Sequence, residues 1–528
     1  MGRALVGWVV AVMLGLGQWM PAAAQQRASI TIARAIDADR YDPHRTAARA
    51  AGEVLHMLAD TLVTLDWDQR SIRPGLAREW EVSEDGLRYT FRLRDDVRFC
   101  SGREMTAVDV AWSLSRWVDP ATRSPTAWRA GRVVRIHATD STTLVYELAE
   151  PHADLLHQLS LFFGVVLDRE AVERLGEGFG IRGFGGTGPF CWREWVPGSR
   201  LTLVRHAAYR WGPPIYANRG PAEIDRVVWT VQADDAARGA AVMGGQADLT
   251  PYPPLAMMEA LRRHRLVQIV EPSQPQWLAF LGFKVDRPQV ADVRVRRAIA
   301  HAVDRAALVR QVYFGEAHPA ISLLAPGTLD YSASASNSGA GYDPAAAVAL
   351  LEEAGWPLGA DGFRQRNGQR LSLDVYGFAG PWQRVLEAVQ ADLAQIGVEM
   401  RVSLFDPAIA WGRLAGQDFD AFVLSAPYVS AGDLLGLYFD SRRIPTPNRM
   451  NWRDAETDQL LARGRTALTA DERATAHAAL QARLQEATVW LPLVHERLPV
   501  AAHTRITGLR AHGLYGIALH QALDLRLR

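Results

Sequence analysis

Lysine is almost missing from this sequence, which has a single lysine, Lys284, among its 58 basic residues. A Schiff base or a phosphate-binding loop needs a lysine, and no phosphate-loop motif surrounds Lys284. Net charge is missing too, since 58 basic and 58 acidic residues balance, which excludes a strongly basic nucleic-acid-binding protein. The 528 residues, 48% of them hydrophobic, exceed the roughly 250–300 that one core organises, so we expect at least two lobes.

Apolar runs long enough to cross a membrane are also missing. The best candidate, residues 4–16, follows Arg3 and precedes alanines at 22–24 that suit cleavage by a signal peptidase. Its roughly 13 residues fall short of the about 20 that span a bilayer. We therefore predict that residues 1–24 are a cleaved signal peptide and that the protein is periplasmic, with an uncleaved membrane anchor as the alternative.

Cysteine is rare, with two residues, Cys100 and Cys191. In an exported protein an even pair is typically joined as a disulfide. The bridge would close a loop of about 90 residues and stabilise the fold by about 4–5 kcal/mol. Two separate buried thiols are the alternative, because sequence alone does not determine their separation. Neither reading favours a metal site, and we expect no metal and no cofactor.

Enzyme signatures are missing as well. The sequence has no Gly-x-Ser-x-Gly, His-Glu-x-x-His, Ser-x-x-Lys or Cys-x-x-Cys motif. Neighbouring acids, such as Asp37 with Asp39 or Glu352 with Glu353, are more typical of a solvated surface than of an acid–base pair. We therefore expect that the protein is not an enzyme, and a secreted hydrolase with an unrecognised carboxylate pair is the alternative.

A glycine-rich loop over residues 176–188 twice matches the Gly-x-Gly-x-x-Gly fingerprint of dinucleotide sites. Such a site needs a strand before the loop and a helix after it. Here a helical segment over 170–175 precedes the loop and a strand-like segment begins at Phe190, so the order is reversed. We predict a turn beneath a packed strand and no nucleotide site.

Strands and helices alternate in the C-terminal half. Strands are predicted over 371–376, 398–404 and 419–424, and a helix over 382–396 lies between the first two. This alternation indicates an α/β lobe. Upstream, apolar residues recur at helical spacing over 295–303, and we expect that helix to end near Gly315.

Tryptophan and arginine are abundant, with 17 tryptophans in the chain. Tryptophans lining a cleft between lobes would suit an organic ligand, although core filling is the common role of any single one. Arg384 lies at the start of the 382–396 helix, where acids are favoured, so it is a candidate to face a ligand carboxylate. A plain surface arginine is the alternative.

A series of segments resembles the family 5 extracellular solute-binding proteins of ATP-binding cassette transporters, the dipeptide- and oligopeptide-binding group. The most specific is Asp292-Val293-Arg294-Val295-Arg296-Arg297-Ala298-Ile299, which continues into Ala302-Val303-Asp304-Arg305. The other matching segments are 41–44, 74–80, 97–102, 106–110, 186–190, 245–248, 350–356, 390–393 and 491–494. They occur in the order of the family and cover essentially the whole mature chain.

The resemblance implies a bilobal α/β periplasmic-binding-protein fold with an extra inserted subdomain and a ligand cleft between the lobes. Its expected parts are lobe I over 25–65, the inserted subdomain over 66–160, lobe I again over 161–271, lobe II over 272–495, and a return to lobe I over 496–528.

The implied function is capture of a peptide-like or other polar organic solute and its delivery to a membrane permease. The lobes are expected to close on the ligand, and we expect a monomer that binds no nucleic acid. A sensory or chaperone-like binding protein on the same fold is a further alternative.

The resemblance also points to ligand-binding residues. Trp277 and Tyr428 are expected near the lobe junction, and Arg384 matches the position of a carboxylate-binding arginine in dipeptide binders. We add Asp433, Trp382 and Ala35 to this expected site.

The chain departs from the family where peptide binders carry an acid for the α-amino group. That position falls near Pro427, and Asp433 is displaced toward the following helix. Because the carboxylate anchor is kept and the amine anchor is lost, we predict a ligand with a carboxylate or several hydroxyls rather than an ordinary free peptide.

Overall fold

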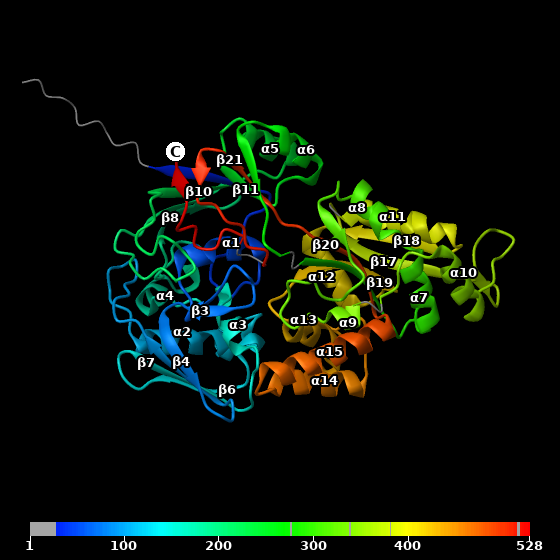
Figure 1. The fold of residues 1–528 in the computed structure, drawn as a ribbon, viewed down its shortest axis with the longest axis horizontal. Helices are drawn as coiled ribbons and strands as arrows, with labels where there is room; N and C mark the ends of the chain where they lie inside the picture. The colour runs from blue at the N-terminus through cyan, green and yellow to red at the C-terminus, as the bar shows by residue number, and fades with distance from the viewer. Residues whose placement is uncertain (1–27, 275–276, 337–338, 381, 515–517) are drawn as a thin grey trace, which may run out of the picture.

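The computed structural model describes residues 28–274, 277–336, 339–380, 382–514 and 518–528. The predicted signal peptide, 1–24, lies outside these ranges. None of the helices within them has the length and apolarity that a membrane span requires. The chain forms two lobes side by side, each built on its own sheet (Figure 1).

Lobe I is built on a seven-stranded sheet to which both ends of the described chain contribute. In spatial order its strands are β12 (Val267–Val270), β21 (Val500–His503), β11 (Leu249–Pro251), β1 (Ser29–Arg34), β10 (Arg226–Val231), β9 (Arg200–Arg205) and β8 (Phe190–Val196). The helices of this lobe are α1 (Arg49–Leu58), α4 (Arg169–Leu175), α5 (Asp235–Met243) and α6 (Met258–Arg263). β1 pairs in parallel with β10 and β11, and β21 brings the C-terminal part of the chain into the sheet.

The inserted subdomain is a four-stranded antiparallel sheet with helices against it (Figure 1). Its strands, in spatial order, are β4 (Ala77–Val82), β5 (Arg88–Leu93), β7 (Thr143–Leu148) and β6 (Val133–Ala138), and its helices are α2 (Ala107–Val118) and α3 (Leu155–Leu159). A capping box starts α2, in which the Thr106 backbone N–H donates to the Asp109 carboxylate over 2.9 Å. One hydrophobic cluster contains Phe91 and Leu144 of the subdomain together with Ile32 and Trp229 of lobe I, so the two share a core.

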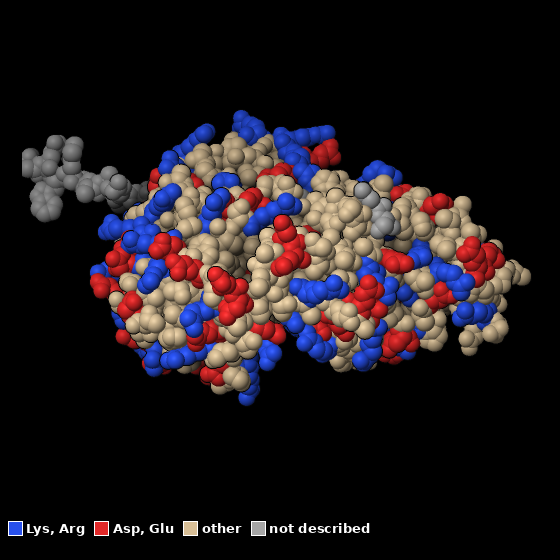
Figure 2. All heavy atoms as spheres, turned by 60° about the horizontal axis from the view of Figure 1, so that its bottom comes forward, with Lys and Arg blue, Asp and Glu red and all other residues tan. Residues whose placement is uncertain are grey.

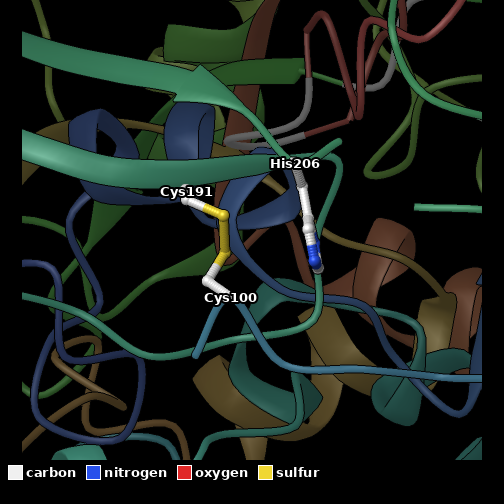
Figure 3. A group of neighbouring side chains, drawn as sticks. All are labelled: Cys100, Cys191 and His206. Atoms are coloured by element: carbon white, nitrogen blue, oxygen red, sulfur yellow. A yellow bond between two sulfur atoms is a disulfide. The ribbon is translucent and has the colours of Figure 1, made fainter. Parts of the chain in front are cut away.

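A disulfide joins the inserted subdomain to lobe I, which confirms the predicted pairing of the two cysteines. Cys100 and Cys191 have Cα atoms 5.8 Å apart, and Cys191 lies in β8. Figure 3 shows the His206 ring beside this bridge. His206 Nδ1 lies 2.9 Å from the carbonyl oxygen of Gly188. Because both sulfurs are bonded to each other, neither is a thiolate that could hold a metal ion.

Lobe II is built on a six-stranded sheet covered by helices on both faces. Its strands, in spatial order, are β14 (Ala317–Pro319), β20 (Trp490–Glu496), β13 (Trp277–Phe283), β19 (Ala421–Pro427), β17 (Ser372–Phe378) and β18 (Glu399–Phe405). One face packs against α7 (Val293–Ala302), α8 (Arg305–Gln311), α10 (Pro344–Glu353) and α11 (Trp382–Gln395). The other face carries α12 (Pro407–Gly416), α13 (Ala431–Phe439), α14 (Ala455–Thr466) and α15 (Ala470–Ala487).

Short elements complete the fold. They are β2 (Val63–Leu65), β3 (Ile72–Pro74), α9 (Ala333–Ser336), β15 (Gln365–Arg366), β16 (Gln369–Arg370), β22 (Ile506–Thr507) and β23 (Arg526–Leu527).

The expectation of one helix from 295 to near Gly315 is wrong. The chain forms α7, leaves the helical path at Val303, and starts α8 at Arg305. The Asp304 carboxylate accepts a hydrogen bond from the Ala307 N–H over 2.8 Å and so caps the second helix.

The glycine-rich loop forms the predicted turn ahead of β8. A side chain at Gly188 would place its Cβ 2.5 Å from the backbone of Leu58, at the end of α1. The two backbone segments therefore lie too close together for any residue but glycine. The loop therefore serves packing between α1 and β8.

The chain crosses between the lobes twice, after β12 and after β20. Ion pairs link the crossings: Glu271 lies 2.8 Å from Arg262 and 2.9 Å from Arg497, and Arg262 also reaches Glu316 of lobe II at 2.8 Å.

Candidate ligand-binding site

A cavity of about 410 Å³ lies between the inserted subdomain and lobe II. Trp128, His152 and Asp154 of the subdomain line one wall, and Asp433 and Arg443 of lobe II line the other. This volume is within the range of pockets that bury small organic ligands.

Asp433 is held in the cavity wall by the start of α13. β19 ends at Pro427, and the Ser430 hydroxyl accepts a hydrogen bond from the Asp433 N–H over 3.0 Å, which caps the helix. The Ser430 hydroxyl also donates to the carboxylate of Asp154 across the interface. Asp433 is therefore buried in the first turn of α13, at the boundary with the subdomain.

The carboxylate of Asp433 is neutralised by an arginine of the inserted subdomain. Arg129 Nη1 lies 2.6 Å from Asp433 Oδ1 and donates to Gln158 Oε1 over 2.7 Å. Burial raises the pKa of Asp433, and the Arg129 guanidinium opposes this effect. The acid that the sequence places nearest to the amine anchor of peptide binders thus already has an internal cation as partner.

Aromatic rings surround the Arg129 guanidinium. Its Cζ lies 4.5 Å from the ring centroid of Trp128, 5.3 Å from that of Phe163 and 5.7 Å from that of Tyr428. These are cation–π distances, and such contacts strengthen where water is excluded. Tyr428, a predicted site residue, therefore packs beside the cavity wall without being one of the residues that line the cavity.

Arg443 differs from the other arginines at the cavity. Arg442 pairs with Asp440 at 2.6 Å and Arg465 pairs with Glu150 at 3.4 Å. Within the described ranges the Arg443 side chain makes neither an ion pair nor a hydrogen bond; its guanidinium lies 4.8 Å from the Trp128 ring. Burial lowers the pKa of Arg443. A half-buried guanidinium at the wall of a cavity is suited to bind an anionic group.

Trp277 and Ala35 lie near the lobe junction but not in the cavity lining. Trp277 begins β13, where it pairs with Pro427 on one side and Glu496 on the other. The guanidinium of Arg49 lies 5.8 Å from its ring. Ala35 directly follows β1 and is half-buried.

Arg384 and Trp382 lie in the first turn of α11. Because β17 and β19 are parallel neighbours, the loop from β17 to α11 and the residues after Pro427 leave the sheet at the same edge. Arg384 is exposed, Trp382 packs partly against the core of lobe II, and neither lines the cavity. Their predicted roles in binding stay predictions.

Sequence reasoning missed Trp128, Arg129 and Arg443. A usable signal was present for the last: two arginines, 442 and 443, follow Asp440, and one nearby acid leaves one of them without a partner. Arg129 gave no such signal, because its partner lies 304 positions away.

Two sheet-based lobes joined by two crossings, with a cavity between parts of both, define the class of bilobal periplasmic binding proteins. Solved structures show the same fold. The ABC transporter-associated periplasmic binding protein DppA from Helicobacter pylori, in complex with the peptide STSA, has a TM-score of 0.80 at 23% identity over 95% of this chain and 99% of its own. AppA from Bacillus subtilis with a nonapeptide has a TM-score of 0.81 at 19% identity, with the same two coverages.

The family follows from the sequence comparison. The model of the bacterial extracellular solute-binding proteins, family 5, matches residues 71–442, and the chain belongs to this family. The glutathione-binding protein GsiB from Escherichia coli O1:K1 is 27% identical over 483 residues, covering 89% of both chains. GsiB from Shigella flexneri is 26% identical over 481 residues with the same coverage. The resemblance, the bilobal fold and the role of solute-binding component of an ATP-binding cassette importer are thereby confirmed.

Proposed function

We propose that this protein captures a small organic solute bearing a carboxylate in the cavity between the inserted subdomain and lobe II. The observation that carries the proposal is Arg443, a half-buried cation in the cavity wall with no carboxylate partner in the described part of the chain. A charge-assisted hydrogen bond to such a group is roughly twice as strong as a neutral one.

The charges of the cavity also explain why an ordinary free peptide is a poor candidate. A peptide's α-amino group needs an unpaired carboxylate, whereas Asp433 is bonded to Arg129. The other acids that line the cavity are engaged too: Asp440 with Arg442, Glu150 with Arg465, and Asp154 with Ser430 and Arg473. Long-range attraction does not replace such a local contact, because Figure 2 shows acidic and basic side chains interspersed over the drawn face, in keeping with the zero net charge.

Glutathione is the first solute to test. The curated relatives are named for binding it. It has two carboxylates, and its one free amine is on the γ-linked glutamate rather than at an ordinary peptide N-terminus. It therefore fits the predicted loss of the amine anchor better than a dipeptide does.

Titration calorimetry of the Arg443→Gln variant tests the proposal. We expect binding of glutathione, or of the carboxylate solute found by a thermal-shift screen, to weaken by about 10- to 100-fold, since a hydrogen bond to a charged group contributes about 1.5–3 kcal/mol. Arg366→Gln is the matched control. Arg366 is exposed, its guanidinium lies 4.2 Å from the centroid of the Trp356 ring, and it is not among the residues that line the cavity. Equal affinity of wild type and Arg443→Gln, or tight and sequence-tolerant binding of di- and tripeptides, would refute the proposal.

We also propose the finer properties expected from the sequence. The mature protein begins after residue 24, acts as a periplasmic monomer, and is divided near residues 66, 161, 272 and 496. It releases its solute unchanged to the permease, without catalysis. Recovery of the solute from a long incubation, checked by mass spectrometry, distinguishes this from the hydrolase alternative, which requires a cleaved product.

A further inference from the structure

Arg449 is a buried arginine that forms no ion pair with any residue the structure describes. It is 8% exposed, and its Nε atom is buried without a hydrogen-bond partner. Across the described ranges its side chain forms neither a hydrogen bond nor an ion pair. Buried charges in proteins are normally paired, because an unpaired one keeps a large desolvation cost. The position therefore calls for a partner from outside the chain.

Among the described residues, the surroundings of Arg449 supply aromatic rings but no acid within ion-pair distance. Its guanidinium lies 5.2 Å from the ring centroid of Trp411 on α12. Burial lowers the pKa of Arg449, and the nearby phenols of Tyr438 and Tyr428 oppose this shift. Those two hydroxyls are 3.2 Å apart, and burial raises the pKa of both, so neither supplies a negative charge near neutral pH.

The same place is unusually apolar on its outer side. Two large apolar side chains of α12 are exposed to solvent: Trp411 is 51% exposed and Ile409 is 56% exposed. The Phe378 ring packs against Trp411 at 5.0 Å between centroids. Exposed aromatic surface beside a buried cation is suited to a ligand that has both an apolar part and an anionic group.

Tyr428 connects Arg449 to the cavity. Its ring lies 5.7 Å from the guanidinium of Arg129, the partner of Asp433 in the cavity wall. Its hydroxyl donates to that of Tyr438, which lies near Arg449. Figure 1 draws α12, the helix of Trp411, and α13, the helix of Tyr438, on the side of lobe II nearer to lobe I. The unpaired Arg443 and the unpaired Arg449 thus flank the neutralised pair of Arg129 and Asp433.

We propose that Arg449 and Trp411 form a second anion-binding subsite, so that the solute carries two anionic groups separated by an organic scaffold. The inference rests on the proposed function for the first group, which Arg443 binds. Arg449 binds the second group, a carboxylate or a phosphate, and Trp411 covers the adjoining part of the scaffold.

The test compares diacids with their monoesters. The probes are glutathione, glutarate and succinate, each with its monoethyl ester, and 4-phosphonobutyrate as the phosphonate counterpart of glutarate. Thermal shift and calorimetry are measured on wild type, Arg449→Met, Arg443→Gln and the control Arg366→Gln. In wild type we expect at least one diacid to bind tenfold or more tightly than its ester. A preference for 4-phosphonobutyrate over glutarate would identify a phosphate-type group, and the reverse a carboxylate.

The variants show which arginine holds which group. Arg449→Met should weaken binding of the preferred diacid by about tenfold. If esterification blocks the group that Arg449 binds, the ester and the diacid should bind Arg449→Met equally; if it blocks the other group, they should bind Arg443→Gln equally. If Arg443→Gln weakens binding and Arg449→Met does not, the second subsite is wrong and the proposed function stands. If no diacid binds more tightly than its ester, the second subsite is overturned. If neither variant weakens binding, both the second subsite and the proposed function are overturned.

A measurement without ligand separates this role from a structural one. An arginine kept for a ligand contributes nothing to the free protein, so Arg449→Met should unfold at the same or a higher urea concentration than wild type. A clear drop in the urea midpoint of Arg449→Met would show that the arginine stabilises the fold, and would count against the subsite.

Discussion

The inserted subdomain touches two neighbours by different means. Toward lobe I it shares one hydrophobic cluster and the disulfide, and Arg116 pairs with the buried Asp42 at 2.6 Å. Toward lobe II the contacts are mainly polar, with the pair of Arg129 and Asp433 at their centre. Among the described residues, Val429 is the one member of the shared cluster that lobe II contributes.

This difference indicates which boundary can open. Separating apolar surfaces exposes them to water at about 25 cal/mol per Å², whereas ion pairs and hydrogen bonds are exchanged for contacts with water at small net cost. The subdomain is therefore expected to move together with lobe I, and the cavity is expected to open along the face toward lobe II. A solute that binds Arg443 would then favour the closed form.

The largest effect is expected from removing the disulfide. Replacing both Cys100 and Cys191 by serine frees a loop of about 90 residues in the unfolded chain, which costs about 4–5 kcal/mol of unfolding free energy. Urea denaturation of the double variant against wild type measures this difference. Affinity for the solute should change little, because the bridge lies on the boundary that stays closed. A loss of affinity with unchanged stability would reverse our assignment of the two boundaries.

A smaller effect, of a different kind, is expected from Asp433→Asn. The substitution keeps the shape of the side chain and leaves the Arg129 guanidinium buried without a counter-charge whenever the lobes are closed. Breaking a buried pair in this way costs about 3–5 kcal/mol. Because water reaches both groups once the lobes separate, we expect the cost to fall on the closed form at the low end of this range.

Small-angle X-ray scattering measures that shift. The radius of gyration of Asp433→Asn should exceed that of wild type, while the urea midpoint stays nearly unchanged. Replacing both partners, in Arg129→Met with Asp433→Leu, should restore the compact form, since an apolar pair leaves no charge unpaired. Equal scattering of wild type and Asp433→Asn would show that this ion pair does not control closure.

Much of the fold could be predicted from sequence because its signals are local. Capping residues, apolar spacing and ordered motifs lie within a few positions of each other, as for Thr106 and Asp109. The break between α7 and α8 was missed because the apolar spacing continues through Val303, while the cap at Asp304 depends on a backbone turn.

The candidate site was predictable only in part. Asp433 could be named from sequence because a family pattern marks its neighbourhood, and the structure has it in the lining of the cavity. The cation that neutralises it, and the two arginines that have no partner, depend on which distant segments meet. A count of charges in sequence cannot tell a paired arginine from an unpaired one, and here that distinction determines the expected ligand.

The smallest predicted effect is a loss of stability at low pH, at the boundary between the inserted subdomain and lobe I. His512 lies in the C-terminal segment against Trp67, with 5.8 Å between ring centroids, and faces His520 at 6.4 Å. Burial lowers its pKa to about 4; backbone hydrogen bonding to Asp66 opposes this shift, and the nearby Arg510 adds to it. This contact thus depends on a histidine that stays neutral.

The sign of the pH effect follows from that lowered pKa. In the unfolded chain histidine takes up a proton below about pH 6.5, whereas folded His512 does so only near pH 4, so stability is lost as the pH falls between these values. At pH 5 the loss from this one group is about 2 kcal/mol relative to pH 7. His512→Gln should therefore show a difference between its unfolding free energies at pH 7 and pH 5 that is smaller by about that amount. If His512→Gln loses as much stability in acid as wild type does, the acid sensitivity resides in other groups and the boundary toward lobe I is not the one that acid loosens.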